Sequence, residues 1–431
     1  MRLLLVSPRF PPSSAADSQR LRMLLPHFKA QGCRAEVLAV DPICCTTELD
    51  PWQQDHLPRH AQVHRVRGLS RRWARLPALG SIDARCHRAM ARAGSRLLRQ
   101  DRFDAVYFST TEFGCFRLGP LWQRRHGVPF LIDYQDPWVN DHYRLHPLIK
   151  PPGGRLKYAV VDRLNRIQEP RVLRHAAGYT AVSPAYPADL QSRYPFAASI
   201  PALVLPFPGS RHDFLNLADF PVSQLPFNPH DGLLHWVSIG RGGADLSQAV
   251  EGLFAALRDH GQPSLLQRLR LHFLGTSYAA PGCGIPTIRP LAERHGLGHL
   301  VEERTDRLPL STALASLKAA DALLVLGSND PSYTASKIYP YLLAAKPLLA
   351  IQHSRSSVCE LIERCGGAQL VRFDATTSTS SLAAAIGRLW LQDDQHSQPL
   401  PLDHQAFRPH TAEAQAQQLV AFIRRCITAV P

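Results

Sequence analysis

The stretch of residues 320–351, ADALLVLGSNDPSYTASKIYPYLLAAKPLLAI, contains the pattern that best predicts the fold. Residues 322–326 form an apolar run with the length of a buried strand, residues 327–336 are rich in turn-forming types, and residues 337–344 have the character of a short helix. A second apolar run follows at residues 348–351. Strand, polar loop, helix and strand in this order are typical of a parallel α/β sheet, which binds ligands at the carboxyl ends of its strands.

The start of this expected helix has the chemistry of an anion-binding site. Thr334 and Ser336 bring hydroxyl groups, Lys337 brings a cation, and the first turn of a helix has backbone N–H groups without partners. With the small Ala335 between them, these groups suit a phosphate. Ser and Thr before a helix are also ordinary caps, and a lysine there is commonly solvated, so this stretch alone leaves both interpretations open.

The same alternation of strands and helices extends through the whole chain. The expected strands are residues 3–7, 36–40, 63–66, 104–109, 129–133, 178–182 and 203–205 in the first half, and 234–239, 270–274, 300–303, 322–326, 348–351 and 369–373 in the second. We therefore expect an α/β protein with two Rossmann-like, doubly wound parallel-sheet domains, residues 1–205 and 232–405, that face each other across a cleft. Residues 206–231 are rich in Pro, Asn and Asp and are expected to link the domains.

Length and composition agree with two globular domains. The chain has 431 residues, of which 45% are hydrophobic and 19% charged. It has no apolar run of about 18 residues, and its N-terminus enters a strand directly, so we expect a cytoplasmic protein without a signal peptide or a membrane span. The nine cysteines are scattered, without a C-x-x-C pair, and are expected to be reduced thiols.

The net charge of +14 is compatible with three classes of partner: nucleic acid, an anionic membrane surface, or phosphorylated substrates. No RNA-binding signature, helix-turn-helix pattern or zinc-finger spacing favours nucleic acid. Residues 65–102 form the densest basic stretch, interleaved with apolar residues such as Trp73, Leu76 and Met90. This stretch could lie on the inner face of a membrane, as a peripheral attachment, or could be a solvated helix face.

The first half places polar side chains where a ligand site is expected. Asp133 ends an expected core strand and Asp136 follows it in the sequence YQDPW, although an Asp in such a turn could simply cap the next segment. Ser109 and Thr110 follow the neighbouring strand. These acidic and hydroxyl groups suit an acceptor substrate. In that role, Asp136 could orient the acceptor or stabilise positive charge that develops during the reaction.

The second half has a cationic character at the corresponding place. Gly240, Arg241, Gly242 and Gly243 do not form a G-x-G-x-x-G motif, which disfavours a dinucleotide cofactor. Arg241 and Lys337 could instead hold a diphosphate through charge-assisted hydrogen bonds. A cationic pocket of this kind suits transfer of a group from a nucleoside diphosphate, because the charge of the leaving group must be stabilised.

Seven segments, taken in order, resemble glycosyltransferase family 4. They are LLLVSPRFPPSS, FDAVYFS, LIDYQDPW, YTAVS, SIGRGG, LHFLGTSYA and the stretch 320–351. Members of this family are retaining enzymes of the two-Rossmann-domain fold called GT-B, and the resemblance covers almost the whole chain. It implies a hexosyltransferase that moves a sugar from a nucleotide-sugar co-substrate and needs no other cofactor. It also implies that residues 406–431 form a helix that packs back toward the N-terminal domain.

The resemblance assigns roles to particular residues. It places Arg241 on the donor diphosphate and residues 334–337 at the phosphate or ribose. Arg241 and Lys337, together with Asp136 from its position after a strand, are the expected catalytic residues. Gly275, Thr276 and Ser277 would line the nucleobase or ribose, next to Gly240. Ser13, Ser14 and Ala15 would approach the phosphates and the acceptor. Members of the family use no obligatory metal, and no D-x-D motif stands at a strand end here.

Two positions depart from the family pattern. Many members have a Glu-x7-Glu pair, and Pro340 stands where the second Glu, a ribose ligand, is expected. The Lys expected shortly after Arg241 falls at residues 244–247, which contain no Lys. The sequence therefore leaves three alternatives to a sugar transferase for a surface polysaccharide, glycolipid or small metabolite: a nucleotide-sugar epimerase or phosphorylase of the same fold, a noncatalytic member, or a cationic membrane-surface binding protein.

Overall fold

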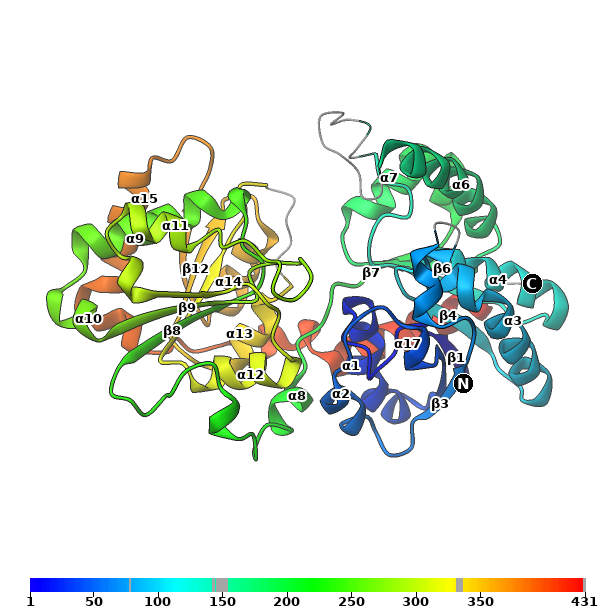
Figure 1. Cartoon of the computed structure of the whole chain (residues 1–431). Coiled ribbons are helices and arrows are strands. Elements are labelled where there is room, and N and C mark those ends of the chain that lie inside the picture. Colours follow the sequence, from blue (N-terminus) through cyan, green and yellow to red (C-terminus); the bar gives the residue numbers. More distant parts are fainter. Residues whose placement is uncertain (77–78, 142–143, 145–153, 331–335, 429–431) are drawn as a thin grey trace. The chain divides into compact units, whose positions relative to one another are not determined.

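The computed structural model describes residues 1–76, 79–141, 144, 154–330 and 336–428. The chain divides into two compact units (Figure 1). Unit 1 combines Met1–Pro208 with Ala412–Pro431, and unit 2 is Gly209–Thr411. Unit 1 is therefore built from both ends of the chain, and unit 2 from its middle.

Unit 1 contains a parallel sheet of seven strands in the order β3-β2-β1-β4-β5-β6-β7. The strands are β1 (Arg2–Val6), β2 (Arg34–Val40), β3 (Gln62–Val66), β4 (Ala105–Ser109), β5 (Phe130–Tyr134), β6 (Gly178–Ala181) and β7 (Ala202–Val204). In β1, Leu3 and Leu5 face one core while Leu4 and Val6 face the other. This continuous apolar run is needed because helices cover both faces of a parallel sheet.

The helices of unit 1 enclose these two cores (Figure 1). On the Leu3 side lie α1 (Gln19–Phe28) and α17 (Ala412–Thr428), which pack against each other. On the Leu4 side lie α3 (Ile82–Gln100) and α4 (Leu118–His126). The remaining α-helices among the described residues of unit 1 are α2 (Pro51–Asp55), α6 (Arg155–Leu173) and α7 (Ala185–Arg193). The last helix of the chain is thus part of the same core as the first.

Unit 2 contains a parallel sheet of six strands in the order β10-β9-β8-β11-β12-β13. The strands are β8 (Leu234–Ile239), β9 (Leu269–Leu274), β10 (Val301–Arg304), β11 (Ala322–Leu326), β12 (Leu348–His353) and β13 (Gln369–Phe373). Its helices are α8 (Arg211–Leu215), α9 (Ser247–His260), α10 (Pro263–Arg268), α11 (Arg289–Arg294), α12 (Leu310–Ala319), α13 (Ile338–Ala344), α14 (Ser357–Cys365), α15 (Thr379–Ile386) and α16 (His404–Phe407). The core between sheet, α9 and α15 contains the buried pair Trp236 and Trp390.

The predicted α/β fold with two parallel sheets is confirmed, with some local differences. In the stretch 320–351, α13 begins at Ile338, so Ser336 and Lys337 lie in the turn before the helix. Thr334 and Ala335 lie outside the described residues. The segment 206–231, expected as a linker, joins unit 2 from Gly209 onward and contains α8, because Gly209 pairs with Thr411 and α8 packs on α12.

Candidate functional site

In unit 2, the two cations expected to bind a phosphate lie close together at the carboxyl edge of the sheet. Gly240 follows β8 with a φ of 130°, and a Cβ atom added there would stand 3.3 Å from Nζ of Lys337. The lysine amine therefore rests against the backbone of the glycine turn, and a side chain at this position would both strain the backbone and crowd the amine. Lys337 and Arg241 thus lie close together at this edge, and Arg241 contributes electrostatic repulsion at Lys337.

A carboxylate that the sequence analysis missed joins these cations. Arg241 donates hydrogen bonds from both terminal nitrogens to Asp245, at 2.8 Å to Oδ1 and 2.6 Å to Oδ2. Ser328, after β11, donates to the same carboxylate at 2.6 Å. This bidentate pair is strong because both partners are charged. The site therefore holds two cations and one anion, where the family pattern has a second cation near Asp245.

The protonation of Lys337 is sensitive to this environment. Burial lowers the pKa of Lys337 to about 8, with Arg241 adding repulsion and Asp245 partly opposing it. The hydrogen bond from Arg241 lowers the pKa of Asp245. Within the described residues, the side-chain amine of Lys337 makes no hydrogen bond, and its interactions with Arg241 and Asp245 are coulombic. An anion beside it would restore a counter-charge to a partly desolvated ammonium.

The other predicted donor residues lie in the loop after β9. Thr276 donates from Oγ1 to Glu303 at 2.7 Å, and its carbonyl accepts from the amide of Gly242 at 2.8 Å. Ser277 donates its amide to the carbonyl of Thr305 at 3.0 Å, and Gly275 has a φ of 74°. The Gly242–Thr276 bond joins this loop to the glycine turn, so the structure brings these residues to one edge, beside Arg241. Ser336, which directly precedes Lys337, is exposed to solvent.

In unit 1, Asp133 organises the carboxyl edge of the sheet from a buried position. Its Oδ2 accepts from Nε of Arg20 at 2.7 Å and from Ser109 at 2.8 Å, and its Oδ1 accepts from Thr180 at 2.6 Å. Arg20 also donates to the carbonyl of Leu205 at 2.6 Å. Both partners of this ion pair are fully buried. Asp133 therefore ties α1, β4, β6 and the end of β7 together.

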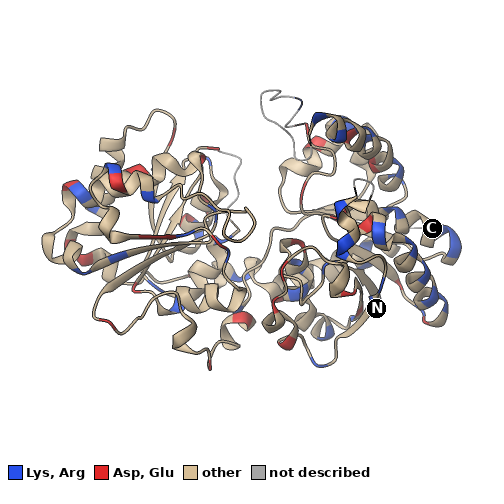
Figure 2. Ribbon diagram, in the orientation of Figure 1, with Lys and Arg blue, Asp and Glu red and all other residues tan. Residues whose placement is uncertain are grey.

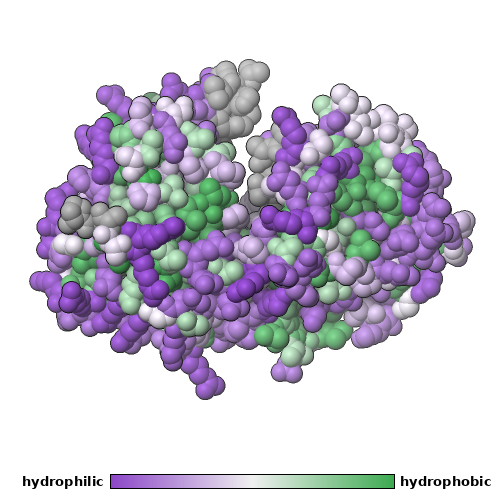
Figure 3. Space-filling model, turned by 180° about the vertical axis from the view of Figure 1, so that it is seen from behind, coloured by the Kyte–Doolittle hydropathy of each residue, from purple (hydrophilic) through white to green (hydrophobic). Residues whose placement is uncertain are grey.

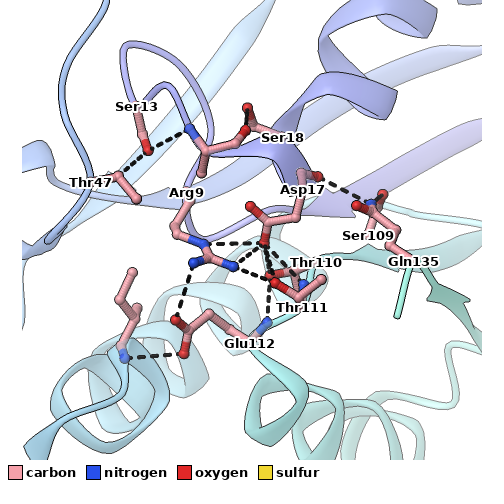
Figure 4. A network of polar contacts seen from close by, with 12 residues as sticks. Arg9, Ser13, Asp17, Ser18, Thr47, Ser109, Thr110, Thr111, Glu112 and Gln135 are labelled. Carbon is pink, nitrogen blue, oxygen red and sulfur yellow. Dashed lines mark hydrogen bonds and ion pairs between the residues drawn. The ribbon is translucent and has the colours of Figure 1, made fainter. Parts of the chain in front are cut away.

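A second polar cluster, centred on Asp17 and Arg9, lies beside it (Figure 4). Oδ2 of Asp17 accepts from Arg9 at 2.7 Å, from Oγ1 of Thr110 at 2.8 Å and from the amide of Thr111 at 2.9 Å. Glu112 lies 3.8 Å from Arg9 and accepts from the amide of Ile82 at the start of α3. Burial raises the pKa of Glu112, although Arg9 opposes the shift. Two carboxylates thus surround one guanidinium.

Asp17 keeps one oxygen without a protein partner. Its Oδ1 is buried and makes no hydrogen bond with the residues described by the structure. The neighbouring Gln135 donates to the carbonyl of Asp17 at 3.1 Å and to Ser109 at 2.8 Å, and its own Oε1 is also buried without a partner. Buried polar atoms are usually hydrogen-bonded, so two such oxygens in one cluster point to a hydrogen-bond donor at this edge.

The remaining predicted acceptor residues differ in their access to solvent. Ser13 is buried and shares a hydrogen bond of 2.5 Å with Thr47, and Ala15 is buried beside it. Ser14 donates its amide to the carbonyl of Glu48 at 2.9 Å. Asp136 is exposed, and partial desolvation together with the negative charge of Asp17 raises its pKa, against the effect of Arg9. Among the predicted acids, Asp136 is thus the one that a ligand can reach directly.

Comparison with known proteins places the chain among glycosyltransferases in fold. Residues 18–208 match the family described as "Glycosyl transferase 4-like domain". Three solved structures with the GT-B fold are similar over nearly the full length of both chains. They are HepE from Anabaena in complex with UDP and glucose (15% identity, 100% of this chain and 99% of that one, TM-score 0.53), a glycosyltransferase from Rickettsia africae (12%, 99% and 99%, 0.57), and α,α-trehalose 6-phosphate synthase from Burkholderia multivorans (13%, 100% and 100%, 0.59). No curated protein matches.

Proposed function

Because the chain has the GT-B fold and its first half carries a glycosyl transferase 4-like domain, we propose that it is a retaining glycosyltransferase. It transfers a sugar, a hexose by our expectation, from a nucleoside diphosphate sugar to a hydroxyl group of a polysaccharide, glycolipid or small metabolite. The observation that carries this proposal is the convergence of Arg241 and Lys337 at the carboxyl edge of unit 2. These cations suit the diphosphate of a leaving nucleotide.

The reaction breaks the bond between the anomeric carbon of the sugar and the diphosphate oxygen, and forms a new bond from that carbon to the acceptor oxygen. Negative charge grows on the diphosphate as the first bond breaks, and the acceptor hydroxyl passes its proton to an oxygen of the departing diphosphate. Lys337 and Arg241 stabilise the departing diphosphate, so the proposal needs no metal ion. Asp136 orients the acceptor or faces the positive charge that develops on the sugar.

Asp17 is a further residue that we assign to the acceptor. Its Oδ1 atom lacks a protein partner in the described structure, and an acceptor hydroxyl is a hydrogen-bond donor of the right kind. Asp133, in contrast, is saturated by protein donors and positions Ser109 and Gln135 beside Asp17. The acceptor edge would thus combine the buried carboxylates of Asp133 and Asp17 with the exposed carboxylate of Asp136.

The first donor to test is a UDP-sugar, because solved neighbours include HepE with UDP-glucose and UDP-forming trehalose-phosphate synthases. The experiment measures binding and turnover with UDP-, GDP- and ADP-sugars, detecting both transfer to added acceptors and slow donor hydrolysis. We expect one nucleotide class to bind and turn over. Absence of binding and turnover with every donor would overturn the proposal.

A noncatalytic nucleotide-sugar binding protein is the second candidate, and two observations favour it. The carboxylate of Asp245 already accepts hydrogen bonds from both terminal nitrogens of Arg241. Pro340 lies in the first turn of α13, and its ring has no group that could form a hydrogen bond with a ribose. This candidate predicts saturable donor binding without hydrolysis or transfer. Measuring both properties on the same sample separates it from the transferase.

A further inference from the structure

Helix α6 of unit 1 has its polar and apolar faces reversed relative to an ordinary surface helix. Of its 19 residues, Glu169, Val172 and Leu173 are buried, all near its C-terminal end. Five large aliphatic residues on it are exposed: Leu156 (83%), Val160 (54%), Val161 (44%), Leu164 (48%) and Ile167 (39%). Single exposed apolar residues are normal on protein surfaces, but five on one helix are a patch that needs an explanation.

The inward face of α6 is held by polar contacts. Asn165 accepts from Nε1 of Trp138 at 3.1 Å, and Tyr158 donates to the carbonyl of Asn140 at 3.1 Å. Nearer the C-terminus, Glu169 accepts from the hydroxyl of Tyr194 at 3.0 Å. Asp162 pairs with Arg166 at 2.8 Å, so both acidic residues of the helix are engaged within unit 1. Hydrogen bonds rather than apolar burial therefore attach most of this helix.

The outward face combines aliphatic and basic side chains. Leu156, Val160 and Leu164 follow each other at intervals of four residues and so form one stripe along the helix. The exposed cations Lys157, Arg163 and Arg171 lie beside this stripe at helical spacing, and no acidic residue shares it. Figure 2 shows Lys and Arg along α6, and Figure 3 shows that hydrophobic residues elsewhere reach the back surface in separate patches among hydrophilic ones.

We propose that the outward face of α6 docks on an anionic lipid bilayer. Aliphatic side chains enter the boundary between headgroups and acyl chains while Lys157, Arg163 and Arg171 pair with lipid phosphates, a composition that favours helices lying in the membrane interface. The binding partner must have both apolar and negatively charged groups, because the outward face of α6 presents aliphatic and cationic side chains. In the described part of the chain, no helix is long and apolar enough to cross a membrane, so the contact is peripheral.

The docking surface is not the basic stretch that the sequence suggested. In residues 65–102, α3 buries Met90 and Leu98 in the core of unit 1. Trp73 and Leu76 remain half-exposed next to Arg71, Arg72 and Arg75. Among the described residues, this smaller cluster has a similar chemistry but fewer exposed large apolar side chains than α6, so it provides the matched comparison for α6.

If the chain is the proposed glycosyltransferase, docking through α6 has a consequence for its acceptor substrate. Tyr158 and Arg166 of α6 contact Asn140 and Asp141, in the segment that follows β5 and carries Asp136. The helix therefore lies beside the carboxyl edge of the unit 1 sheet. A bilayer bound to α6 would bring lipid headgroups to the same edge, which favours a lipid-linked acceptor over a freely diffusing one.

The test uses the full chain and vesicles of stated composition. Co-sedimentation is measured with phosphatidylcholine vesicles alone and with vesicles that also contain phosphatidylglycerol, at low and high salt. We expect binding to the anionic vesicles only, weakened but not abolished by salt, because aliphatic insertion is not screened. Absence of binding to either kind of vesicle, or equal binding to both, would overturn the proposal.

Variants locate the contact. The triple variant Leu156→Ser, Val160→Ser and Leu164→Ser should bind at least about 100-fold more weakly, and each of Lys157→Gln and Arg163→Gln about fivefold more weakly. All five positions are exposed, so folding should be unaffected. The matched controls are Leu215→Ser, an equally exposed position on α8, and Trp73→Ser, and both should bind as the unaltered chain does.

Two further outcomes would contradict the assignment. Unchanged vesicle binding by the triple variant, with loss in Trp73→Ser, would move the contact to the smaller cluster. A change of molecular mass in solution from a multimer to a monomer in the triple variant would show that a second copy of the chain covers the stripe. UDP-sugar binding by the triple variant, measured without vesicles, should stay unchanged, so failure of docking and failure of the transferase proposal can be told apart.

Discussion

At the scale of single residues, the feature that most affects the proposed chemistry is the contact of Asp245 with Arg241. A diphosphate needs the same two guanidinium nitrogens that this carboxylate occupies at 2.8 and 2.6 Å. Donor binding must therefore exchange one anion for another, with Lys337 as a neighbouring cation that is already present. The affinity for nucleotides thus depends on a competition inside the protein.

We expect Asp245→Asn to bind nucleoside diphosphates about tenfold more tightly, because the neutral amide competes less for Arg241. Arg241→Ala and Lys337→Ala should each weaken binding by about tenfold or more. Calorimetric titration with UDP, GDP and ADP measures these changes. Ser328→Ala, which removes only a hydrogen bond to Asp245, is the control and should have a small effect; equal nucleotide affinity in all variants would remove the phosphate assignment.

Nucleotide affinity should also depend on pH through Lys337. Its pKa of about 8 in the unbound protein should rise when an anion binds, so binding takes up a proton above this pH. We expect affinity to be nearly constant up to about pH 7.5 and then to fall, approaching tenfold for each further pH unit. Titrations in buffers of different ionisation enthalpy detect the proton uptake directly. A Lys337→Gln variant should lack this dependence, and a persistent slope in it would assign the effect elsewhere.

The buried pair of Arg20 and Asp133 should be a stability determinant. Arg20→Met leaves the carboxylate of Asp133 buried without its cation, which should lower the free energy of unfolding by about 3–5 kcal/mol. Denaturant unfolding followed by circular dichroism measures this loss. The control is Arg34→Met, an exposed arginine 3.7 Å from Glu36, which should cost less than about 1 kcal/mol. Similar losses in both variants would contradict the role assigned to the pair.

At the scale of elements, two neighbouring strands of unit 2 carry a buried histidine pair. Nδ1 of His235 in β8 lies 2.9 Å from Nε2 of His272 in β9, and the ring of Phe227 stacks on both. Asp231 contacts His235 at 3.0 Å and Glu302 contacts His272 at 3.2 Å. Burial lowers the pKa of His272 to about 4, although Glu302 opposes the shift.

This shift predicts acid sensitivity. Between about pH 6.5 and pH 4 the unfolded chain binds a proton at His272 that the folded chain does not, so stability falls as the pH is lowered through this window. The expected loss between pH 7 and pH 5 is about 2 kcal/mol. Thermal unfolding at a series of pH values measures it, and His272→Gln should flatten the profile. A wild-type stability that is constant over this range would show that His272 is charged in the folded state.

The sequence predicted strands better than helices, for a physical reason. All thirteen strands of the described structure were expected, because most of them are buried apolar runs with turn residues at their ends. The edge strands β3 and β7 are only partly buried and gave a weaker pattern. The short helices α2, α8, α10, α11 and α16 were not expected, because four to six residues show no apolar period and their positions depend on tertiary contacts.

For the candidate site, residue types were predictable but partners were not. Arg241 stands out because it lies in a glycine-rich turn directly after a strand, and Lys337 because it directly precedes a helix. Asp245 follows Arg241 by only four residues, but a sequence does not show whether a turn brings the two charges together. Asp17 and Arg9 were hidden in the same way: both lie in the loop and turn after β1, and the cluster forms only when β4 brings Thr110 beside them.

At the scale of the whole molecule, unit 1 depends on residues from both ends of the chain. Ile423 and Leu419 of α17 are fully buried in the core that contains Leu3 and Leu21. Ile423→Ala should therefore destabilise unit 1 by about 2–5 kcal/mol and leave unit 2 unchanged. Scanning calorimetry, with hydrogen exchange to assign each transition, separates the units. The control is Leu382→Ala in α15, which should affect unit 2 instead; loss of protection in unit 2 from the Ile423 variant would contradict the division.

The return of α17 to unit 1 also determines the order in which the protein can be completed during synthesis. Domains generally fold as they leave the ribosome, with the N-terminal one first. Here the middle unit has all of its residues once Thr411 has emerged, while the first unit still lacks a helix of its core until Thr428 is free. Nascent chains should therefore acquire protease resistance in the middle unit first. Any product that terminates early should carry a finished middle unit and an open first core, which quality-control proteases would recognise.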